Sequence, residues 1–271
     1  MKPVSVQEIM DIMEELAPRS YAEDWDNPGL LVGSPAQETE RVVVCLDVSD
    51  AVVQMAIEHD AHLIVSHHPM IFHAMKHLRT DTPVGFRIAE LVKHDIAVFA
   101  AHTNLDIAQG GVNDVLAQAV GLEGLAHFVV QGQDEAGGTY SLGRVGELQE
   151  PMTITAFAAQ VRDALPTAHV RYVSAGARPV QRVALCSGSG AEFIERAAKL
   201  GADAYLTGDV RYHDAQHAVE LGLHVVDAGH FGTEFPVVEW LRTRLAAALT
   251  ERGLTADVIA DTQSEDFFHV I

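Results

Sequence analysis

Residues 41–65 read RVVVCLDVSDAVVQMAIEHDAHLIV, and their pattern indicates the fold class of the chain. The apolar, β-branched run over residues 41–46 predicts a buried strand, residues 50–58 have helical periodicity, and residues 61–65 predict a second strand. Two strands joined by a helix form a βαβ unit, and its strands are parallel because the helix returns the chain to the same end of the sheet. The stretch therefore predicts an α/β fold with a parallel sheet.

The order of elements in this stretch returns later in the chain. Residues 182–186, 191–200 and 202–206 repeat the strand, helix and strand at a constant spacing, and five aligned positions are identical. These positions are Arg41/Arg182, Val42/Val183, Cys45/Cys186, Ala56/Ala197 and Ala61/Ala202. A repeat of this kind indicates that the two halves of the chain have similar topology.

Two further apolar runs extend the similarity between the halves. Residues 95–101 and 222–228 each lead into a histidine that is followed, at the fourth position, by a carboxylate. The two pairs are His102 with Asp106 and His230 with Glu234. We interpret the chain as an internal duplication that gives two α/β domains. The expected boundaries are residues 1–125 with 235–271 for the first domain and 126–234 for the second. The alternative, that parallel α/β units look alike whatever their origin, stays open.

A pair of histidines follows the second strand. His67 and His68 come directly after the apolar run 63–65, and Pro69 marks an abrupt turn. Adjacent side chains on a regular strand point to opposite faces, so both rings reach one pocket only where the strand has ended or where two cations share the site. The pair therefore points to a dinuclear metal site. The alternative is that they are two polar loop residues in a chain that has 15 histidines.

The composition limits the classes of partner. The 271-residue chain has 38 acidic and 18 basic side chains and a formal charge of −20, so its averaged surface repels phosphate backbones and anionic lipid. Duplex nucleic acid is therefore not an expected partner, although a bound cation could still attract an anionic small molecule such as a nucleotide. Cys45 and Cys186 lie in apolar strand-like runs, which indicates reduced core thiols and a cytoplasmic protein.

The N-terminal run and the rest of the hydropathy pattern give no membrane signal. Residues 1–16 mix acidic with apolar side chains, which predicts an amphipathic helix and not a signal peptide. No stretch reaches the roughly 18 uninterrupted apolar residues of a membrane-spanning helix. We therefore expect a protein that does not contact a membrane.

Polar side chains gather at the carboxyl ends of the expected parallel strands, where open α/β sheets present their ligand sites. They are His67, His68, His102, Asp106, Asp209, His213, His230 and Glu234. Imidazole and carboxylate together favour Zn²⁺, Fe²⁺ or Mn²⁺, whereas an all-oxygen set would favour Ca²⁺ or Mg²⁺. These eight side chains offer more donors than one catalytic ion with an open position needs. The set therefore predicts two divalent metal ions (Zn, Fe or Mn) that share a carboxylate and water.

Five blocks of sequence resemble the signature of one family. They are residues 25–30 (WDNPGL), 66–69 (SHHP), 102–106 (HTNLD), 207–209 (TGD) with His213, and 227–234 (DAGHFGTE). In this order the blocks resemble the Nif-three-like dinuclear metal centre family, whose members are called GTP cyclohydrolase I type 2 homologues. The resemblance implies two intertwined α/β domains with a dinuclear metal site in the cleft between them, and it implies a homohexamer.

The resemblance also implies roles for individual residues. The implied metal ligands are His67, His68, Asp106, His230 and Glu234. His102 and His213 match family histidines near the site, which orient ligands or carry protons, with a purely structural role as the alternative. Some family members carry a further domain between the two halves. Residues 131–175 are too few for such a domain, so the chain resembles a short form of the family.

Hydrolysis is the function that these features favour. A pair of divalent ions makes water acidic enough to attack near neutral pH and polarises a carbonyl, amidine or phosphoryl group. We therefore expect a divalent-metal-dependent hydrolase of a small nucleotide-like or heterocyclic substrate, with GTP ring opening as the activity that the family label suggests. Two alternatives stay open, a non-catalytic metal-binding or scaffold protein and a metal-dependent phosphoesterase.

A glycine-rich turn gives a weaker signal. Gly188-Ser189-Gly190 follows an expected strand and precedes an expected helix, so its amides could bind an anion. It lacks the Lys-Ser/Thr of a P-loop and the third glycine of a dinucleotide-binding loop. A plain tight turn is the alternative.

Overall fold

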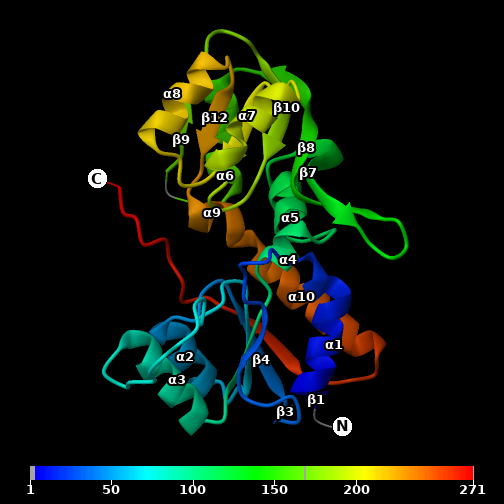
Figure 1. Ribbon diagram of the computed structural model, residues 1–271, viewed down its shortest axis with the longest axis vertical. Coiled ribbons are helices and arrows are strands. Elements are labelled where there is room, and N and C mark those ends of the chain that lie inside the picture. Colours follow the sequence, from blue (N-terminus) through cyan, green and yellow to red (C-terminus); the bar gives the residue numbers. More distant parts are fainter. Residues whose placement is uncertain (1–3, 168, 271) are drawn as a thin grey trace. The chain divides into compact units, whose positions relative to one another are not determined.

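The computed structural model describes residues 4–167 and 169–270 and has a mixed α/β fold (Figure 1). The chain forms two compact units, Met1–Ala108 with Val237–Ser264 and Gln109–Pro236 with Glu265–Ile271. The α/β fold expected from the sequence is therefore confirmed. The domain boundaries expected from the sequence and the origin of the halves by duplication stay predictions.

A five-stranded sheet with the order β13-β4-β5-β6-β2 forms the centre of the first unit. The strands are β2 (Gly29–Val32), β4 (Arg41–Cys45), β5 (Leu63–Ser66), β6 (Ala97–Ala100) and β13 (Asp257–Ala260). β13, β4, β5 and β6 are parallel, whereas β2 is antiparallel to β6. Parallel neighbours need a crossover, and α2 (Asp50–Glu58) and α3 (Pro83–Lys93) provide it. The βαβ unit predicted from residues 41–65 is present.

Helices cover both faces of this sheet. Val43 and Cys45 of β4 pack with α2 and α3, because alternate side chains of a strand point to opposite faces. Figure 1 shows α1 (Val6–Leu16) and α10 (Pro236–Glu251) on the other side of β4. Ser5 begins α1 with a capping box, in which its hydroxyl accepts from the Glu8 amide and its own amide donates to the Glu8 carboxylate. Residues 1–3 of the helix expected over residues 1–16 lie outside the described residues.

A six-stranded sheet with the order β7-β8-β10-β11-β12-β9 forms the centre of the second unit. The strands are β7 (Leu122–Gln133), β8 (Thr139–Met152), β9 (Arg171–Val173), β10 (Val180–Leu185), β11 (Ala204–Thr207) and β12 (His224–Asp227). β10, β11 and β12 are parallel, and the outer strands are antiparallel to their neighbours. One face packs with α5 (Val112–Ala119) and α6 (Ile154–Ala164), and the other face packs with α7 (Ile194–Lys199) and α8 (Tyr212–Glu220).

The two sheets contain the same run of strands. In the first unit β4, β5 and β6 are parallel and the antiparallel β2 follows; in the second unit β10, β11 and β12 are parallel and the antiparallel β9 follows. The third parallel strand of each run leads into a five-residue helix, α4 (Thr103–Ile107) after β6 and α9 (His230–Glu234) after β12. The sheets differ beyond the first strand of the run, where β13 is parallel and β8 is antiparallel.

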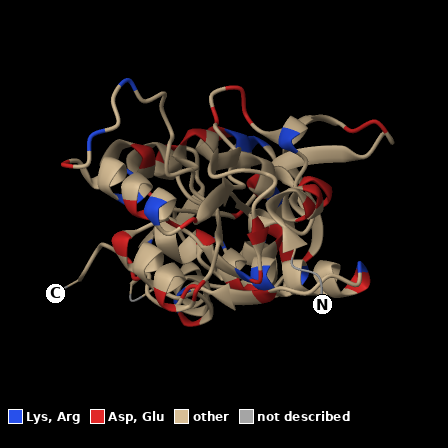
Figure 2. Cartoon of the chain, turned by 90° about the horizontal axis from the view of Figure 1, so that it is seen from below, with Lys and Arg blue, Asp and Glu red and all other residues tan. Residues whose placement is uncertain are grey.

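In the described part of the chain, four further short elements lie outside the two large sheets and the helices that cover them. The remaining elements are β1 (Val4–Ser5), β3 (Glu38–Thr39) and the 3₁₀ turns η1 (Arg19–Tyr21) and η2 (Ala191–Phe193). Asp and Glu recur along most elements, with Lys and Arg scattered between them (Figure 2). None of the helices in residues 4–167 and 169–270 combines the length and the apolar character that crossing a membrane requires.

Candidate metal centre

Three imidazole rings converge in the first unit at the carboxyl ends of β5 and β6. β5 ends at Ser66, so His67 and His68 are not on opposite faces of a regular strand, and their ring centroids are 5.0 Å apart. His102 follows β6, and its ring centroid lies 5.3 Å from that of His67 and 5.6 Å from that of His68. One nitrogen atom from each ring falls within 4.8 Å of the other two, which is close enough for the three to share a metal environment.

Each of these rings is held through its Nδ1 atom. The contacts join Nδ1 of His67 to the Ala101 carbonyl (2.8 Å), Nδ1 of His68 to the Asp47 carboxylate (2.9 Å) and Nδ1 of His102 to the Asp26 carboxylate (2.7 Å). A carbonyl or carboxylate oxygen only accepts, so the proton of a neutral ring lies on Nδ1. The lone pair is then on Nε2, which is the arrangement that metal-binding histidines use.

Asp106 brings a carboxylate to the same cluster. It lies in the short helix α4, its residue is 8% exposed, and its Oδ1 atom is 3.7 Å from Nε2 of His67. Two ligand atoms that each lie about 2.1 Å from one tetrahedral ion are about 3.4 Å apart. The separation therefore suits two ligands of one ion, and the mixed nitrogen and oxygen donors suit Zn²⁺, Fe²⁺ or Mn²⁺.

Asp26 anchors His102 and the start of α4. Its carboxylate contacts His102 Nδ1 and accepts hydrogen bonds from the Thr103 amide (3.0 Å) and hydroxyl (2.5 Å). Burial by itself raises the pKa of Asp26, but the hydrogen bonds from His102 and Thr103, together with the charge of His102, outweigh burial and lower the pKa from 3.8 to about 2. Asp26 is therefore ionised throughout the neutral range and holds the His102 ring in one orientation.

We expect Asp26→Asn to destabilise the protein at neutral pH and to have a smaller effect in acid. Because the folded-state pKa lies below the usual value, ionised Asp26 stabilises the fold above about pH 4, and this stabilisation disappears as the pH falls from about 4 to about 2. Melting temperatures of both proteins across this range measure the effect. Asp24→Asn changes an exposed carboxylate two positions away and provides the control. A constant difference in melting temperature at every pH would contradict the assignment.

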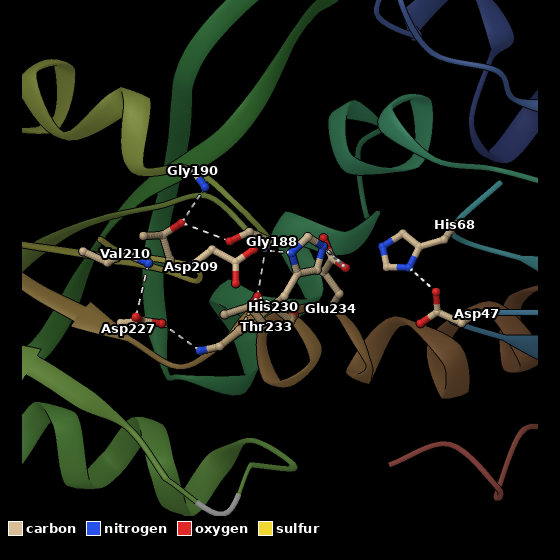
Figure 3. A network of polar contacts seen from close by, with 12 residues as sticks. Asp47, His68, Gly188, Gly190, Asp209, Val210, Asp227, His230, Thr233 and Glu234 are labelled. Carbon is tan, nitrogen blue, oxygen red and sulfur yellow. Dashed lines mark hydrogen bonds and ion pairs between the residues drawn. The ribbon is translucent and has the colours of Figure 1, made fainter. Parts of the chain in front are cut away.

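The second unit brings a histidine and a carboxylate together on α9. His230 and Glu234 are one helical turn apart, and His230 Nε2 lies 3.1 Å from Glu234 Oε2. Asp209 contacts the other ring nitrogen of His230, Nδ1, at 2.8 Å (Figure 3). The Glu234 side chain is 5% exposed, although burying a carboxylate costs several kcal/mol unless a cation compensates it. His230 therefore has the tautomer of a metal ligand, and the spacing of the pair and the burial of Glu234 also suit metal binding.

Gly188 has no side chain and so leaves room for the side chains of His230 and Glu234. A Cβ atom added at Gly188 would lie 2.3 Å from Glu234 Oε1 and 3.2 Å from His230 Nε2, and the residue has a φ of +61°. Its amide donates to the Thr233 hydroxyl (2.9 Å), and the Gly190 amide donates to the Thr207 hydroxyl (3.0 Å). Both glycine amides are therefore engaged within the protein, and the turn supports the His230 and Glu234 side chains rather than presenting those amides to an anion.

We expect Asp209→Asn to weaken metal binding about 10- to 100-fold, because the change removes the charged partner of His230 Nδ1. Asp209 has a φ of +55°, a conformation that asparagine also tolerates, so the variant isolates the loss of charge from backbone strain. Competition with a chelator of known affinity measures the effect. Asp214→Asn, on the neighbouring helix α8, is the control. Equal affinity in both variants would show that Asp209 does not support a metal ligand.

The structure does not bring His213 to these clusters. His213 is exposed at the start of α8, its ring contacts Tyr212 edge-on, and no candidate ligand group in the described part of the chain includes it. Sequence reasoning instead missed the roles of Asp26, Asp47 and Gly188. Their only signal was position, because Asp26 belongs to the WDN block, Asp47 follows β4 and Gly188 belongs to the turn after β10.

Comparisons with known proteins agree over the whole chain. The Duf34/NIF3 (NGG1p interacting factor 3) family matches residues 4–266. The GTP cyclohydrolase 1 type 2 homolog of Clostridium perfringens is 34% identical, covering 99% of this chain and 100% of the relative. The protein of the same name from Streptococcus pneumoniae is also 34% identical, covering 97% and 98%.

Solved structures agree with the sequence matches. A Bacillus cereus protein related to NIF3 superposes with a TM-score of 0.95 at 27% identity, covering 100% of both chains. A Staphylococcus aureus hypothetical protein gives 0.94 at 31% identity and also covers 100% of both chains. Reduced HcgD from Methanocaldococcus jannaschii gives 0.78 at 28% identity, covering 96% of this chain and 98% of that one. The resemblance found in the sequence blocks is thereby confirmed, and the chain belongs to the Duf34/NIF3 family.

Proposed function

We propose that the protein is a divalent-metal-dependent hydrolase of a small nucleotide-like or heterocyclic substrate. The proposed ligands are His67, His68 and Asp106 of the first unit with His230 and Glu234 of the second, acting together on two ions. The observation that carries the proposal is the fixed tautomer of the histidines. Each ring is tied at Nδ1 to a carboxylate or carbonyl oxygen, an arrangement that leaves Nε2 as the ligand atom.

The donor set and its surroundings support metal-assisted hydrolysis. When bound, two divalent ions supply Lewis acidity, which makes water a nucleophile near neutral pH and polarises the group under attack. Neither unit by itself contributes three histidines and two carboxylates from the proposed set. We therefore infer that both units serve one reaction centre, as the resemblance to the family implies. The homohexamer stays a prediction.

His102 is the residue that we propose to move a proton. Its Nδ1 proton is held by ionised Asp26, so its Nε2 atom accepts a proton from the attacking water and returns it to the leaving group. The side chain is 16% exposed, which gives it limited access to solvent. Asp26 and Asp47 fix the rings of His102 and His68, and this pre-organisation lowers the cost of reaching the reactive geometry.

Metal-loaded protein and a substrate panel test the proposal. Protein reconstituted separately with Mn²⁺, Fe²⁺ and Zn²⁺ is incubated with nucleotides and pterins, and products are analysed by mass spectrometry for the mass of one added water. We expect ring hydrolysis with at least one metal. Tight metal uptake without turnover of any compound would favour a non-catalytic metal-binding protein, and phosphate release without ring hydrolysis would favour a phosphoesterase.

A further inference from the structure

Two exposed aromatic side chains flank the candidate metal centre in the first unit. Trp25 is 59% exposed and Phe72 is 40% exposed, although large aromatic side chains gain most of their stabilisation from burial. Their ring centroids are 5.9 Å apart, and the ring planes are inclined at 52°. The rings therefore touch along one side and leave open faces, so a third ring can lie flat against one of them and edge-on to the other.

Both rings contact His102. The centroid of Trp25 is 6.0 Å from that of His102, and the centroid of Phe72 is 6.2 Å from it, in both cases with an edge-on geometry. A ligand ring in contact with either aromatic side chain therefore lies beside the imidazole. Because Nδ1 of His102 is engaged by Asp26, Nε2 is the atom that can accept a hydrogen bond from an N–H group of such a ring.

The two residues that follow Trp25 anchor the loop that presents it. Asp26 holds His102 and Thr103, and the Asn27 side chain donates to the Ile71 carbonyl (2.6 Å), which precedes Phe72. Asp26 and Asn27 therefore set the position of Trp25, and Asn27 ties it to the segment that carries Phe72. Aromatic side chains that are pre-organised in this way bind a ligand without the cost of ordering them first.

We propose that Trp25 and Phe72 form a stacking platform for a planar heteroaromatic ring, such as a purine or a pterin, beside His102. The platform rests on the proposed function in one respect, because it selects ring-bearing substrates for the same site. Its binding step requires neither turnover nor a bound ion. Ring stacking combined with one hydrogen-bonding imidazole recognises a heterocycle and gives no advantage to a sugar phosphate that lacks a base.

Tryptophan fluorescence tests the platform directly. The chain has two tryptophans, Trp25 and Trp240, so in a Trp240→Phe variant the whole tryptophan signal comes from Trp25. We expect guanosine to quench this signal and ribose 5-phosphate to leave it unchanged. Phe72→Ala in the same background should weaken guanosine binding about 5- to 150-fold, because stacking on one aromatic side chain contributes about 1–3 kcal/mol. Phe72→Tyr should restore it.

Matched controls separate the outcomes. Phe86→Ala removes a phenylalanine that is 49% exposed on α3, and it should leave guanosine affinity unchanged. The inference is overturned if Phe72→Ala binds guanosine as tightly as its parent, if ribose 5-phosphate quenches equally, or if the variant changes the oligomeric mass and not the affinity. Guanosine quenching in a protein that turns over no compound of the substrate panel would refute the hydrolase and leave the platform standing. Turnover with an unchanged KM in Phe72→Ala would refute the platform alone.

Discussion

Glu234→Ala is expected to abolish turnover and to lower the metal content of the protein. The Glu234 carboxylate is buried, and Oε2 lies 3.1 Å from His230 Nε2 on the same turn of α9. A Lewis-acidic ion contributes several kcal/mol to transition-state stabilisation, so losing one ligand and its ion corresponds to a decrease in kcat/KM of about a thousandfold or more. His68→Ala, in the other unit, should have an effect of the same size.

Steady-state kinetics and elemental analysis of the same preparations measure this prediction. Glu220→Ala removes an exposed carboxylate at the end of α8, and it should change neither quantity. Glu234→Ala and Glu220→Ala are both expected to fold. Their circular dichroism spectra should therefore match that of the unaltered protein before kinetics and metal content are compared. Full metal content together with full turnover in Glu234→Ala would exclude the carboxylate as a ligand.

Gly188→Ala is expected to lower the metal content of the protein although it replaces no proposed ligand. The added Cβ atom would lie 2.3 Å from Glu234 Oε1, so the carboxylate or the turn must move. The same substitution also strains the backbone, because a φ of +61° costs a non-glycine residue about 1 kcal/mol or more. We therefore expect both lower stability and a loss of metal comparable to that of Glu234→Ala.

Gly201→Ala separates these two effects. Gly201 has a φ of +72°, but an added Cβ atom would meet nothing within 4 Å. This control should lose about the same stability as Gly188→Ala, about 1 kcal/mol in denaturant unfolding, and should keep its metal. If both variants keep full metal content, the close approach of Gly188 to Glu234 has no role in metal binding.

The local pattern of the sequence was sufficient for the central strands and their crossovers. The helix predicted over residues 50–58 has the bounds of α2, and the apolar runs gave β4 and β5 to within two residues. Such elements are readable because one buried face imposes a strict period on the side chains. The parallel pairing of β4 with β5 then follows from the crossover.

Other elements could not be read because their periodicity is broken. β7 contains two register shifts against β8, and Gly124 within it has a φ of +61°, so its side chains do not alternate regularly between faces. In α8 one residue, Ala218, is fully buried, which leaves too little apolar character for a helical pattern. Residues 131–138 are rich in glycine and acidic side chains, which is typical of a surface loop, yet β7 continues to Gln133.

The residues of the candidate site could also be predicted only in part. Its histidines and carboxylates were recognisable because each follows the end of a strand by seven residues or fewer, as with His102 and Asp106 after β6. Their supporting partners were not, because Asp26 is 76 residues from His102 in sequence and Asp47 is 21 residues from His68. Contacts over such separations depend on the fold and leave no local pattern.

The number of metal ions bound per chain tests the proposed two-ion centre directly. The protein is stripped with a chelator, reconstituted anaerobically with Fe²⁺, Mn²⁺ or Zn²⁺ and freed of excess metal, and the ions per chain are counted by elemental analysis. We expect about two ions per chain in the unaltered protein and fewer in Glu234→Ala, with His68→Ala reduced to the same extent. Trace occupancy with all three metals would contradict this expectation.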